Sequence, residues 1–404
     1  MAVRAQIEQP SRMNAGRTIA VMARLLDQQD GLGVYSRELL QHLFALDSTT
    51  RYLVLLGSSR SQPLFEGFAN VQTQVLGGGS SKLWWDQIAV PRAARRGGAD
   101  LLFNPKFSLP LLSRIPAVFV LQSCDWYVNP GNYPWWDNLY IRLMLPLYCR
   151  KASGLLAISQ ATLTELTHRT RIKLSGATVT HAGVAPSFNP LRDPLSLQKF
   201  REQYRLPGRY IFTVARVLHT GNRKMSPYPG GNNERLVRAY QLYRRRSPQS
   251  LPLVVAGRQV REYLLARGFS ATDLEGIQFL GFVPNERIHQ AYQLADCFVL
   301  ATLCESFGIP ILEALASGCP AIVPSTGAGP EVAGHAARLI DPYDEEDIAR
   351  ALQEVTQSSQ LRENLAREGL RRARAFGWQQ AARRVLRVFD SVLSSRRAAV
   401  GVGA

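Results

Sequence analysis

A chain of 404 residues, of which 46% are hydrophobic and 20% charged, is too long for one ordinary core and has ample apolar material for two. Its formal net charge of +17 indicates an anionic partner, but the arginines are spread through helical patterns and no nucleic-acid-binding signature is present. Nucleic acid is therefore the least favoured partner. An anionic membrane surface and a phosphorylated ligand both stay open.

The sequence has neither the pattern of a membrane-spanning protein nor that of a secreted one. No stretch reaches the roughly 18 uninterrupted apolar residues of a spanning helix, and the polar, basic start "MAVRAQIEQPSRMNAGR" is not typical of a signal peptide. The five cysteines are scattered and include no C-x-x-C pair. We therefore expect a cytoplasmic protein with reduced thiols.

In the first half of the chain, short apolar runs alternate with longer helical patterns. The runs are "TIAVMARLL", "RYLVLLG", "VQTQVL", "DLLFNP", "AVFVLQS", "GLLAIS" and "ATVTHAG". This alternation predicts a parallel sheet covered by helices, which is an α/β fold. We assign residues 1–17 to a flexible N-terminus and residues 18–190 to a first domain.

A second series of apolar runs follows a stretch rich in proline and polar residues. We place the linker at 191–208, and a second α/β domain at 209–375 with the runs "RYIFTVARV", "LPLVVAG", "IQFLGFV", "CFVLATL" and "CPAIVPS". The segment 376–395 predicts a final helix, and 396–404 is expected to be a disordered tail.

Two glutamates surround a turn in the second domain. The stretch "LCESFGIPILEALASGCPAIVPS" places Glu305 before the turn "SFGIP" and Glu313 after it. The buried strand "ADCFVLATL" ends just before, and Pro310 suits the first turn of a helix. The turn therefore lies at the carboxyl end of a parallel strand, which is where open α/β sheets bind ligands.

The chemistry of this turn favours a nucleotide sugar. Backbone N–H groups and the positive end of a helix dipole attract phosphate or sugar oxygens, and Gly308 allows the backbone a close approach. Glu313, about one turn into the helix, can accept hydrogen bonds from a diol, while Glu305 lies nearer to whatever the phosphate carries. The alternative is that Glu305 is a solvated loop residue and Glu313 only complements the helix dipole.

The same stretch resembles the signature of the family-four (group 1) retaining glycosyltransferases. Their pattern E-[GS]-F-G-x-P-x-x-E-A-x-x-x-G-x-P is complete from Glu305 to Pro320, and the similarity continues through "FLGFVPNERIHQAYQLADCFVLAT" and "GPEVAGHAARLIDP". The resemblance covers roughly residues 18–395 and is most specific in the second half. It implies the GT-B fold, in which two Rossmann-like domains face each other across a cleft and the last helix crosses back to the first domain.

The resemblance also implies roles for individual residues. Glu313 would hold the ribose hydroxyls of the donor, Glu305 would contact the transferred sugar, and Arg216, in "VARV", would face the diphosphate. The donor would also lie against the turn itself, formed by Ser306, Phe307, Gly308 and Ile309.

In the first domain, "DGLGVYSRELLQHL" follows the first apolar run and opens a helical pattern. Gly31 and Gly33 match the glycine loop of the family, which lies under the donor phosphates and helps to shape the acceptor side. A short G-x-G is also typical of a plain strand-to-helix turn, and that alternative stays open.

The sequence departs from the family pattern where a histidine usually lies close to the transferred sugar. In "VFVLQSCDWYVNP", matching Asp125 and Trp126 to the longer family form puts Gln122 in the place of the histidine, and the shorter form puts Cys124 there. Neither alignment supplies an imidazole. Gln122 and Asp125 are the candidate catalytic residues of this domain.

A second departure concerns the lysine that usually joins the arginine at the diphosphate. The long loop "LHTGNRKMSPYPGGNNERLVRAY" follows Arg216, and Asn232 and Asn233 match the usual Lys-Asn pair. Lys224, inside the insertion, is the candidate replacement. Otherwise the diphosphate is held by one fewer cation.

Two stretches combine tryptophans with arginines, "KLWWDQIAVPRAARR" and "NYPWWDNLYIRLMLPLYCRK". Such patterns are typical of interfacial membrane-binding segments and also of core packing with a solvated basic face. The histidines form no metal-ligand cluster and no D-x-D motif is present, so we expect neither a metal nor another cofactor.

Together these features predict a cytoplasmic, metal-independent, retaining hexosyltransferase, peripheral on the inner membrane face. Its partners would be a UDP- or GDP-sugar donor, an oligosaccharide or lipid-linked acceptor of polysaccharide or glycolipid assembly, and an anionic membrane surface. Two other functions of the same architecture stay open. One is a catalytically weak or inactive partner protein that binds nucleotide sugar, and the other is a sugar-nucleotide epimerase.

Overall fold

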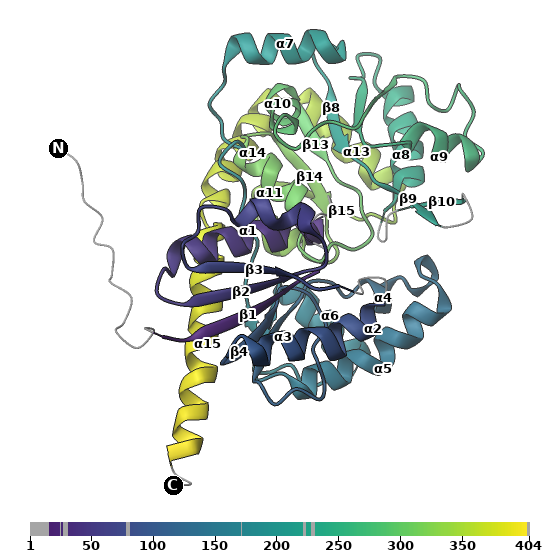
Figure 1. Ribbon diagram of the computed structural model, residues 1–404. Helices are drawn as coiled ribbons and strands as arrows, with labels where there is room; N and C mark the ends of the chain where they lie inside the picture. Colours follow the sequence, from purple (N-terminus) through teal and green to yellow (C-terminus); the bar gives the residue numbers. More distant parts are fainter. Residues whose placement is uncertain are drawn as a thin grey trace, which may run out of the picture.

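The computed structural model describes residues 16–24, 26, 31–77, 81–170, 172–220, 224–227 and 231–401 (Figure 1). These residues form two α/β domains, one built on a seven-stranded sheet and the other on a six-stranded sheet. The strands of each sheet run parallel. The structure confirms the α/β class predicted from the alternating runs. Among the described helices, none combines the length and the apolar character that crossing a bilayer requires.

The N-terminal sheet has the strand order β3-β2-β1-β4-β5-β6-β7. In its central strand, Ile19 and Val21 belong to one hydrophobic core, and Ala20 and Met22 belong to the core on the other face. The sheet is therefore buried on both faces, as a parallel sheet requires. Its strands are β1 (Thr18–Ala23), β2 (Arg51–Leu56), β3 (Val71–Val75), β4 (Leu101–Asn104), β5 (Ala117–Leu121), β6 (Gly154–Ala157) and β7 (Thr178–Val179).

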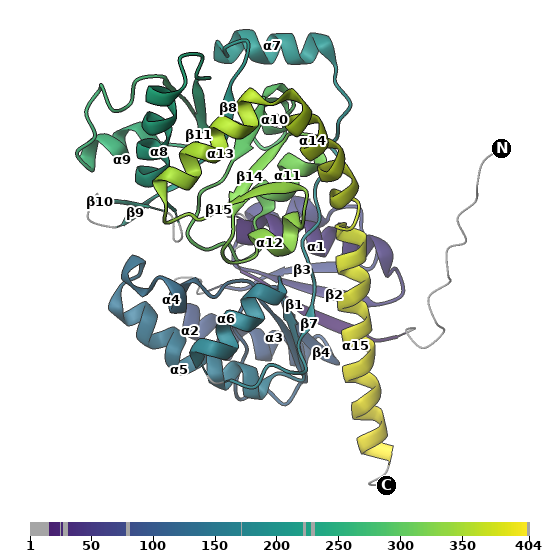
Figure 2. The same ribbon diagram turned by 180° about the vertical axis from the view of Figure 1, so that it is seen from behind.

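Helices cover both faces of this sheet (Figures 1 and 2). They are α1 (Gly31–Leu46), α2 (Lys82–Trp84), α3 (Val90–Arg96), α4 (Asp125–Val128), α5 (Trp135–Lys151) and α6 (Gln160–Thr170), with a π-helical turn at Trp85–Ala89 and 3₁₀ segments at Ser59–Phe65 and Pro130–Asn132.

The C-terminal sheet has the order β12-β11-β8-β13-β14-β15, with β8 and β13 at its centre. The strands are β8 (Ile211–Val214), β11 (Leu253–Ala256), β12 (Ile277–Gly281), β13 (Cys297–Val299), β14 (Ala321–Pro324) and β15 (Ala337–Ile340). A separate antiparallel hairpin consists of β9 (Val217–Thr220) and β10 (Lys224–Pro227). The helices are α8 (Asn233–Arg246), α9 (Val260–Ala266), α10 (Ile288–Leu294), α11 (Ile309–Ala316), α12 (Gly329–Ala333), α13 (Glu345–Gln357) and α14 (Ser359–Ala373).

The segment 191–208, expected to be the linker, contains the helix α7 (Pro194–Tyr204). Asp193 caps this helix by accepting a hydrogen bond from the Leu195 N–H group at 3.2 Å. Phe200 is fully buried, and the Arg287 guanidinium of the C-terminal domain lies over its ring. Most of this segment is therefore a helix docked on the C-terminal domain, because its apolar residues recur at helical spacing.

The last helix, α15 (Trp378–Gly401), leaves the C-terminal domain and runs back along the N-terminal domain (Figure 2). Phe389 packs edge-to-face on Phe103 of β4, with ring centroids 5.0 Å apart. The helix reaches Gly401, so residues 396–401, expected in a disordered tail, are helical. The physical reason is that "RRAAV" is made of residues compatible with a helix, without proline or an internal glycine.

The expected boundary at the N-terminus also shifts. Residues 1–15 lie outside the described part, but Arg17, placed in the flexible segment, is buried. Its guanidinium pairs with Asp47 at 3.1 Å and with Asp390 of α15 at 2.5 Å. Because the arginine joins two carboxylates from distant parts of the chain, it fastens α15 to the N-terminal domain.

Candidate active site

The two glutamates lie around the connection between β13 and α11. We call residues 303–308 of this connection the glutamate turn. Gly308 ends it with a φ of +86°, and a Cβ atom at this position would lie 2.7 Å from Cδ1 of Ile311. Only glycine adopts this conformation without strain. Pro310 then lies in the first turn of α11, so the strand, turn and helix follow one another as the sequence predicts.

Glu313 is oriented by a buried tyrosine. Its Oε2 accepts a hydrogen bond of 2.9 Å from the hydroxyl of Tyr292, which lies fully buried in α10. Burial raises the pKa of Glu313 to about 7, and the bond from Tyr292 acts in the opposite direction. The carboxylate is therefore held in one orientation and can change its charge near neutral pH.

Glu305 lies in the glutamate turn, close to a carboxylate of the other domain. Burial raises the pKa of Glu305 to about 7, and the negative charge of Asp125 contributes in the same direction. Asp125 is therefore near enough for its charge to act on Glu305 across the domain boundary. Their repulsion favours protonation of Glu305, because Asp125 already has two hydrogen-bond donors of its own.

Asp125 begins α4 and is buried. Its Oδ1 accepts from the Asn129 side chain at 2.6 Å, and its Oδ2 accepts from the Tyr133 hydroxyl at 2.7 Å. Burial raises the pKa of Asp125, while these two bonds lower it. The side chain is therefore fixed before any substrate binds.

Gln122 follows β5 and is buried at the carboxyl edge of the N-terminal sheet. Its Nε2 donates to Ser36 Oγ at 3.3 Å and to the carbonyl of Pro105. Its Oε1 is buried and has no hydrogen-bond partner among the described residues. A buried carbonyl oxygen without a partner is costly, so a ligand hydroxyl that donated to it would be bound favourably.

Gly31 and Gly33 lie in the first turn of α1, and Gly33 is buried. The connection from β1 into this helix falls largely outside the described residues. Of the predicted glycine loop, the structure therefore describes the part that belongs to α1. Ser36, one turn further along, contacts Gln122. The start of α1 and the end of β5 therefore meet at one edge of the sheet.

The candidate diphosphate cations follow β8. Arg216 is exposed and directly precedes β9. The neighbouring strand β13 pairs with β8, so Arg216 and the glutamate turn share one edge of the C-terminal sheet. Lys224 opens β10, opposite Thr220, and only its backbone belongs to the described part of the chain.

Asn232, which stands where the family pattern has a lysine, is hydrogen-bonded within the C-terminal domain. Its Nδ2 donates to the carbonyls of Ala301 and Pro342 at 2.8 and 2.7 Å, and its Oδ1 accepts from Arg235. The side chain therefore ties the start of α8 to two loops. A search for the missing lysine alone could not have identified this role.

The two domains make direct polar contacts at the glutamate turn. The carbonyl of Ser306 accepts hydrogen bonds from Ser159 Oγ at 2.5 Å and Thr162 Oγ1 at 3.1 Å. The Ser306 hydroxyl donates to Ser123 Oγ at 3.3 Å, next to which the Cys124 thiol contacts that of Cys304. Glu305 thus lies in a stretch with inter-domain contacts on either side.

A second inter-domain contact involves Glu331 of α12, a residue that sequence reasoning did not single out. Its carboxylate accepts from the backbone N–H groups of Gln160 and Ala161 at 2.8 and 2.9 Å, at the start of α6. Nε2 of His181 lies 2.7 Å from the same carboxylate. These bonds outweigh burial and lower the pKa of Glu331, so an ionised side chain of one domain caps a helix of the other.

The structure therefore brings Glu305, Ser306 and Asp125 together across the boundary. Gln122 and the two glycines share an edge of the N-terminal sheet, while Glu313 and Arg216 lie on the C-terminal domain. In the part of the chain that the structure describes, no three His, Cys, Asp or Glu side chains form a group that could hold a metal ion.

Comparison with known proteins assigns this arrangement to a class. The fold is similar to that of Anabaena HepE, solved with UDP and glucose, with a TM-score of 0.71 at 18% identity over 93% of this chain and all of that one. It is also similar to WaaG, a glycosyltransferase involved in lipopolysaccharide biosynthesis, with a TM-score of 0.66 at 13% identity over 91% of this chain and 98% of that one. The fold is GT-B, the architecture of these glycosyltransferases.

The sequence comparisons narrow the class. Residues 231–372 match the family described as glycosyl transferases group 1. It is 26% identical to O-antigen chain mannosyltransferase B of Escherichia coli over 300 residues, 73% of this chain and 76% of that protein. It is also 26% identical to the serotype-specific mannosyltransferase WbdA of Escherichia coli over 251 residues, 61% of this chain and only 29% of the length of WbdA.

Proposed function

We propose that this glycosyltransferase moves a hexose from a UDP- or GDP-sugar to an oligosaccharide or lipid-linked acceptor, with retention of anomeric configuration and without a metal ion. The observation that carries the proposal is the contact between the glutamate turn and the N-terminal domain. It brings Glu305 close to Asp125, at the same boundary where Ser306 binds three hydroxyl groups of the other domain.

Each candidate residue has a task in this proposal that fits its surroundings. Glu313, held by Tyr292, would accept hydrogen bonds from the ribose hydroxyls. Arg216 would neutralise the charge that develops on the departing diphosphate. The unpaired Oε1 of Gln122 would accept a hydrogen bond from a sugar hydroxyl.

A histidine is not required for the proton transfer in this scheme. The acceptor hydroxyl would attack the anomeric carbon on the face that the diphosphate leaves, and a diphosphate oxygen would take the proton of that hydroxyl. Glutamine in place of histidine keeps a hydrogen-bond partner for the sugar but does not titrate near neutral pH. The proposal of a metal-independent transfer rests on Arg216 and on a sequence without a D-x-D motif.

The relatives support a particular hexose and acceptor class. Both Escherichia coli relatives bear the name mannosyltransferase, and one of them acts on the O-antigen chain. This favours mannose as the transferred sugar and a surface polysaccharide as the product. Because HepE was solved with UDP and glucose, both nucleotides belong in the test.

The experiment is a thermal-shift screen against UDP- and GDP-hexoses, followed by a transfer assay with the donor that stabilises the protein most. Free UDP or GDP formed only in the presence of an oligosaccharide or lipid acceptor would support the transferase. Donor binding without turnover in the wild type, with activity gained in Gln122→His, would instead support an inactive partner protein.

Membrane contact is part of the proposal and rests on α5. The helix buries Ile141, Leu145 and Tyr148 in the core, while an apolar stripe on its other side is exposed to solvent. Trp135 is 71% exposed. The stripe consists of Trp135, Trp136, Leu139, Leu143 and Leu147. An exposed apolar stripe flanked by arginines is suited to the interface of an anionic membrane.

The other tryptophan stretch supports core packing for one tryptophan and surface exposure for the other. Trp85 is buried in the core, as the packing alternative predicted, while Trp84 and Leu83 are exposed. The membrane proposal therefore rests mainly on α5. Co-sedimentation of Leu143→Ser with lipid vesicles tests it, and wild-type affinity in that variant would count against the stripe.

A further inference from the structure

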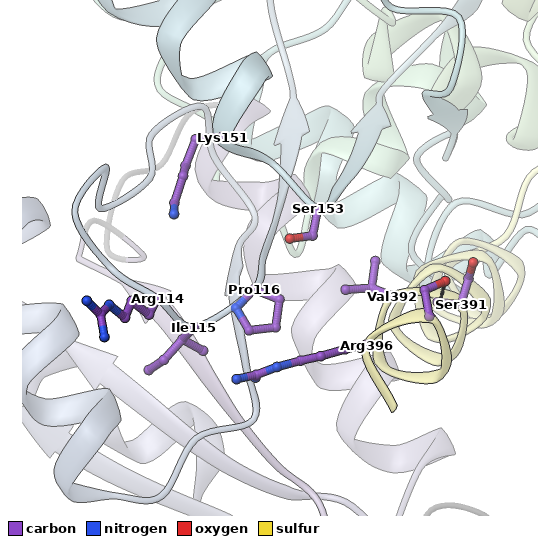
Figure 3. Close-up of a pocket in the computed structure, with 9 residues that line it drawn as sticks. Arg114, Ile115, Pro116, Lys151, Ser153, Ser391, Val392 and Arg396 are labelled. Atoms are coloured by element: carbon purple, nitrogen blue, oxygen red, sulfur yellow. Dashed lines mark hydrogen bonds between the residues drawn. The ribbon is translucent and has the colours of Figure 1, made fainter. Parts of the chain in front are cut away.

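A groove lies between the N-terminal sheet and α15, away from the candidate active site. It consists of two adjoining cavities of about 390 and 460 Å³, which share Ser153, Ser391 and Val392. The groove is lined by residues just before β5 and β6, at the amino ends of these strands (Figure 3). Gln122 and Asp125 follow the carboxyl end of β5, so the groove is a different site at the opposite edge of the sheet.

The charge of this groove has one sign. Its basic side chains come from the loop before β5, the end of α5 and the crossing helix α15, and its lining contains no aspartate or glutamate. We call it the basic groove, defined by Arg114, Lys151, Arg384, Arg387 and Arg396. Cations gathered without a carboxylate repel one another and attract an anion.

The single carboxylate of α15 does not neutralise the groove. Asp390 pairs instead with Arg17, which also pairs with Asp47 on the N-terminal domain. Hydroxyl groups add hydrogen-bond donors: Ser153 and Ser391 line both cavities. In Figure 3, Arg396 extends from α15 past Pro116, while Lys151 points down from the end of α5 and the Ser153 hydroxyl is directed toward the side of Lys151. Ammonium, guanidinium and hydroxyl donors around one space suit the oxygens of a phosphate group.

Two exposed leucines lie close in sequence to residues of the basic groove. Lys151 is the last residue of α5, and Leu147 of the exposed stripe lies one helical turn before it. Leu112, two residues before Arg114, is 92% exposed. A free phosphate metabolite would leave these leucines in water, whereas a phospholipid offers both an anion and acyl chains.

We propose that the basic groove binds the phosphate of an anionic phospholipid at the membrane surface. This inference deepens the membrane contact proposed above and rests on it. The stripe of α5 supplies apolar contact with the bilayer, and the groove supplies selectivity for an anionic headgroup. A headgroup in the groove would anchor α15 and the N-terminal domain together, because both contribute cations.

The test uses the full-length protein and co-sedimentation with two kinds of vesicle, phosphatidylcholine alone and phosphatidylcholine mixed with phosphatidylglycerol. The groove variant is the double substitution Lys151→Ala and Arg396→Ala. The matched control, Arg245→Ala and Arg261→Ala, removes the same charge from two exposed arginines of the C-terminal domain. Thermal unfolding of each variant identifies any loss of fold.

We expect the groove variant, if it is folded as the wild type is, to bind phosphatidylglycerol vesicles about 30-fold more weakly than the wild type. The reason is that it lacks two cations that would lie near the anionic surface. The control should change binding by about twofold or less, because charges beyond a Debye length of about 10 Å are screened at 0.1 M salt. Equal losses in both variants would overturn the groove and leave binding by overall charge.

Two other outcomes would also overturn the proposal. Stabilisation of the wild type by glycerol phosphate, lost in the groove variant, without any vesicle binding, would identify a site for a soluble phosphate. No binding of the wild type to either vesicle would remove the membrane contact itself. Donor-induced stabilisation is measured on the same samples. Failure of the transferase proposal would then appear as a loss of donor binding, independently of the vesicle result.

Discussion

The two sides of the domain boundary at the candidate site are built differently. On the C-terminal side, a strand, a turn and a helix that are consecutive in the chain position Glu305, Gly308 and Glu313. On the N-terminal side, Gln122 contacts Ser36 and Pro105, and these three residues come from three separate segments. The first side is specified by local sequence and the second by tertiary packing. The difference teaches that a local sequence signature predicts its own geometry better than it predicts a site assembled from several segments.

The largest expected effect is on the locally specified side. Glu313→Ala should weaken donor binding about 100-fold or more, because a hydrogen bond to a charged acceptor contributes about 1.5 to 3 kcal/mol and a diol makes two. Titration calorimetry with the stabilising donor measures it. Glu363→Ala, an exposed glutamate of α14, is the matched control. Equal donor affinity in Glu313→Ala and the wild type would contradict the assignment.

On the N-terminal side the expected effect is smaller. Gln122→Ala should lower kcat/KM, and the decrease should correspond to a loss of about 1 to 3 kcal/mol of transition-state binding, because the partner of the amide loses its hydrogen bond. Gln122→His should retain activity, because imidazole also supplies a donor and an acceptor. If Gln122→Ala matched the wild type in kcat/KM, the glutamine would have no part in sugar recognition.

The contact between the two sides gives a third prediction. Glu331→Gln removes the charge that caps α6, so the contact between the two domains should weaken and kcat/KM should fall by about fivefold, an effect of about 1 kcal/mol. The pKa of Glu331 is lowered, so the wild type should keep this contact through the neutral range. An increase in kcat/KM for the variant would contradict the idea that this contact supports the active arrangement.

Protonation of the two buried glutamates gives a prediction for stability. The pKa of Glu305 and that of Glu313 rise from 4.5 to about 7 in the folded protein. The folded state therefore binds more protons than the unfolded state between these values, and the free energy of unfolding should fall as pH rises from 4.5 through 7. Denaturant titrations at several pH values measure it, and Glu313→Gln should have a shallower dependence. The same steepness in both proteins would argue against a raised pKa at Glu313.

The smallest expected effect is that of metal removal. If Arg216 and the start of α11 stabilise the diphosphate, activity should be unchanged in excess EDTA. A loss restored by Mg²⁺ or Mn²⁺ would mean that the diphosphate needs a cation that this side of the domain boundary does not supply.

The same contrast explains how much could be predicted from the sequence. The strand, turn and helix around the glutamate turn could be predicted from the sequence, because the apolar runs, Gly308 and Pro310 determine the local geometry. The partner of Glu313 could not, because Tyr292 lies in another helix and its contact arises only when α10 packs beside α11. The role of Glu331 was missed for the same reason: it bonds to residues about 170 positions away along the chain.

Helix ends were also harder to predict than helix faces. The apolar spacing of α7 could have been recognised within the expected linker, but the proline-rich flanks concealed it. The continuation of α15 to Gly401 depends on weak helix propensity without a distinct stop signal. Arg17 looked like part of a basic, flexible start because Asp390, one of its two partners, lies at the other end of the chain.

The central proposal is that the enzyme transfers the sugar with retention of anomeric configuration. Its most direct test is proton NMR of the anomeric hydrogen in the first product formed from the stabilising donor. If no acceptor is used by the enzyme, the product examined is the sugar released by hydrolysis of the donor. We expect the product to appear first with the anomeric configuration of the donor, and mutarotation of any free sugar to follow later. Initial formation of the opposite anomer would contradict the account.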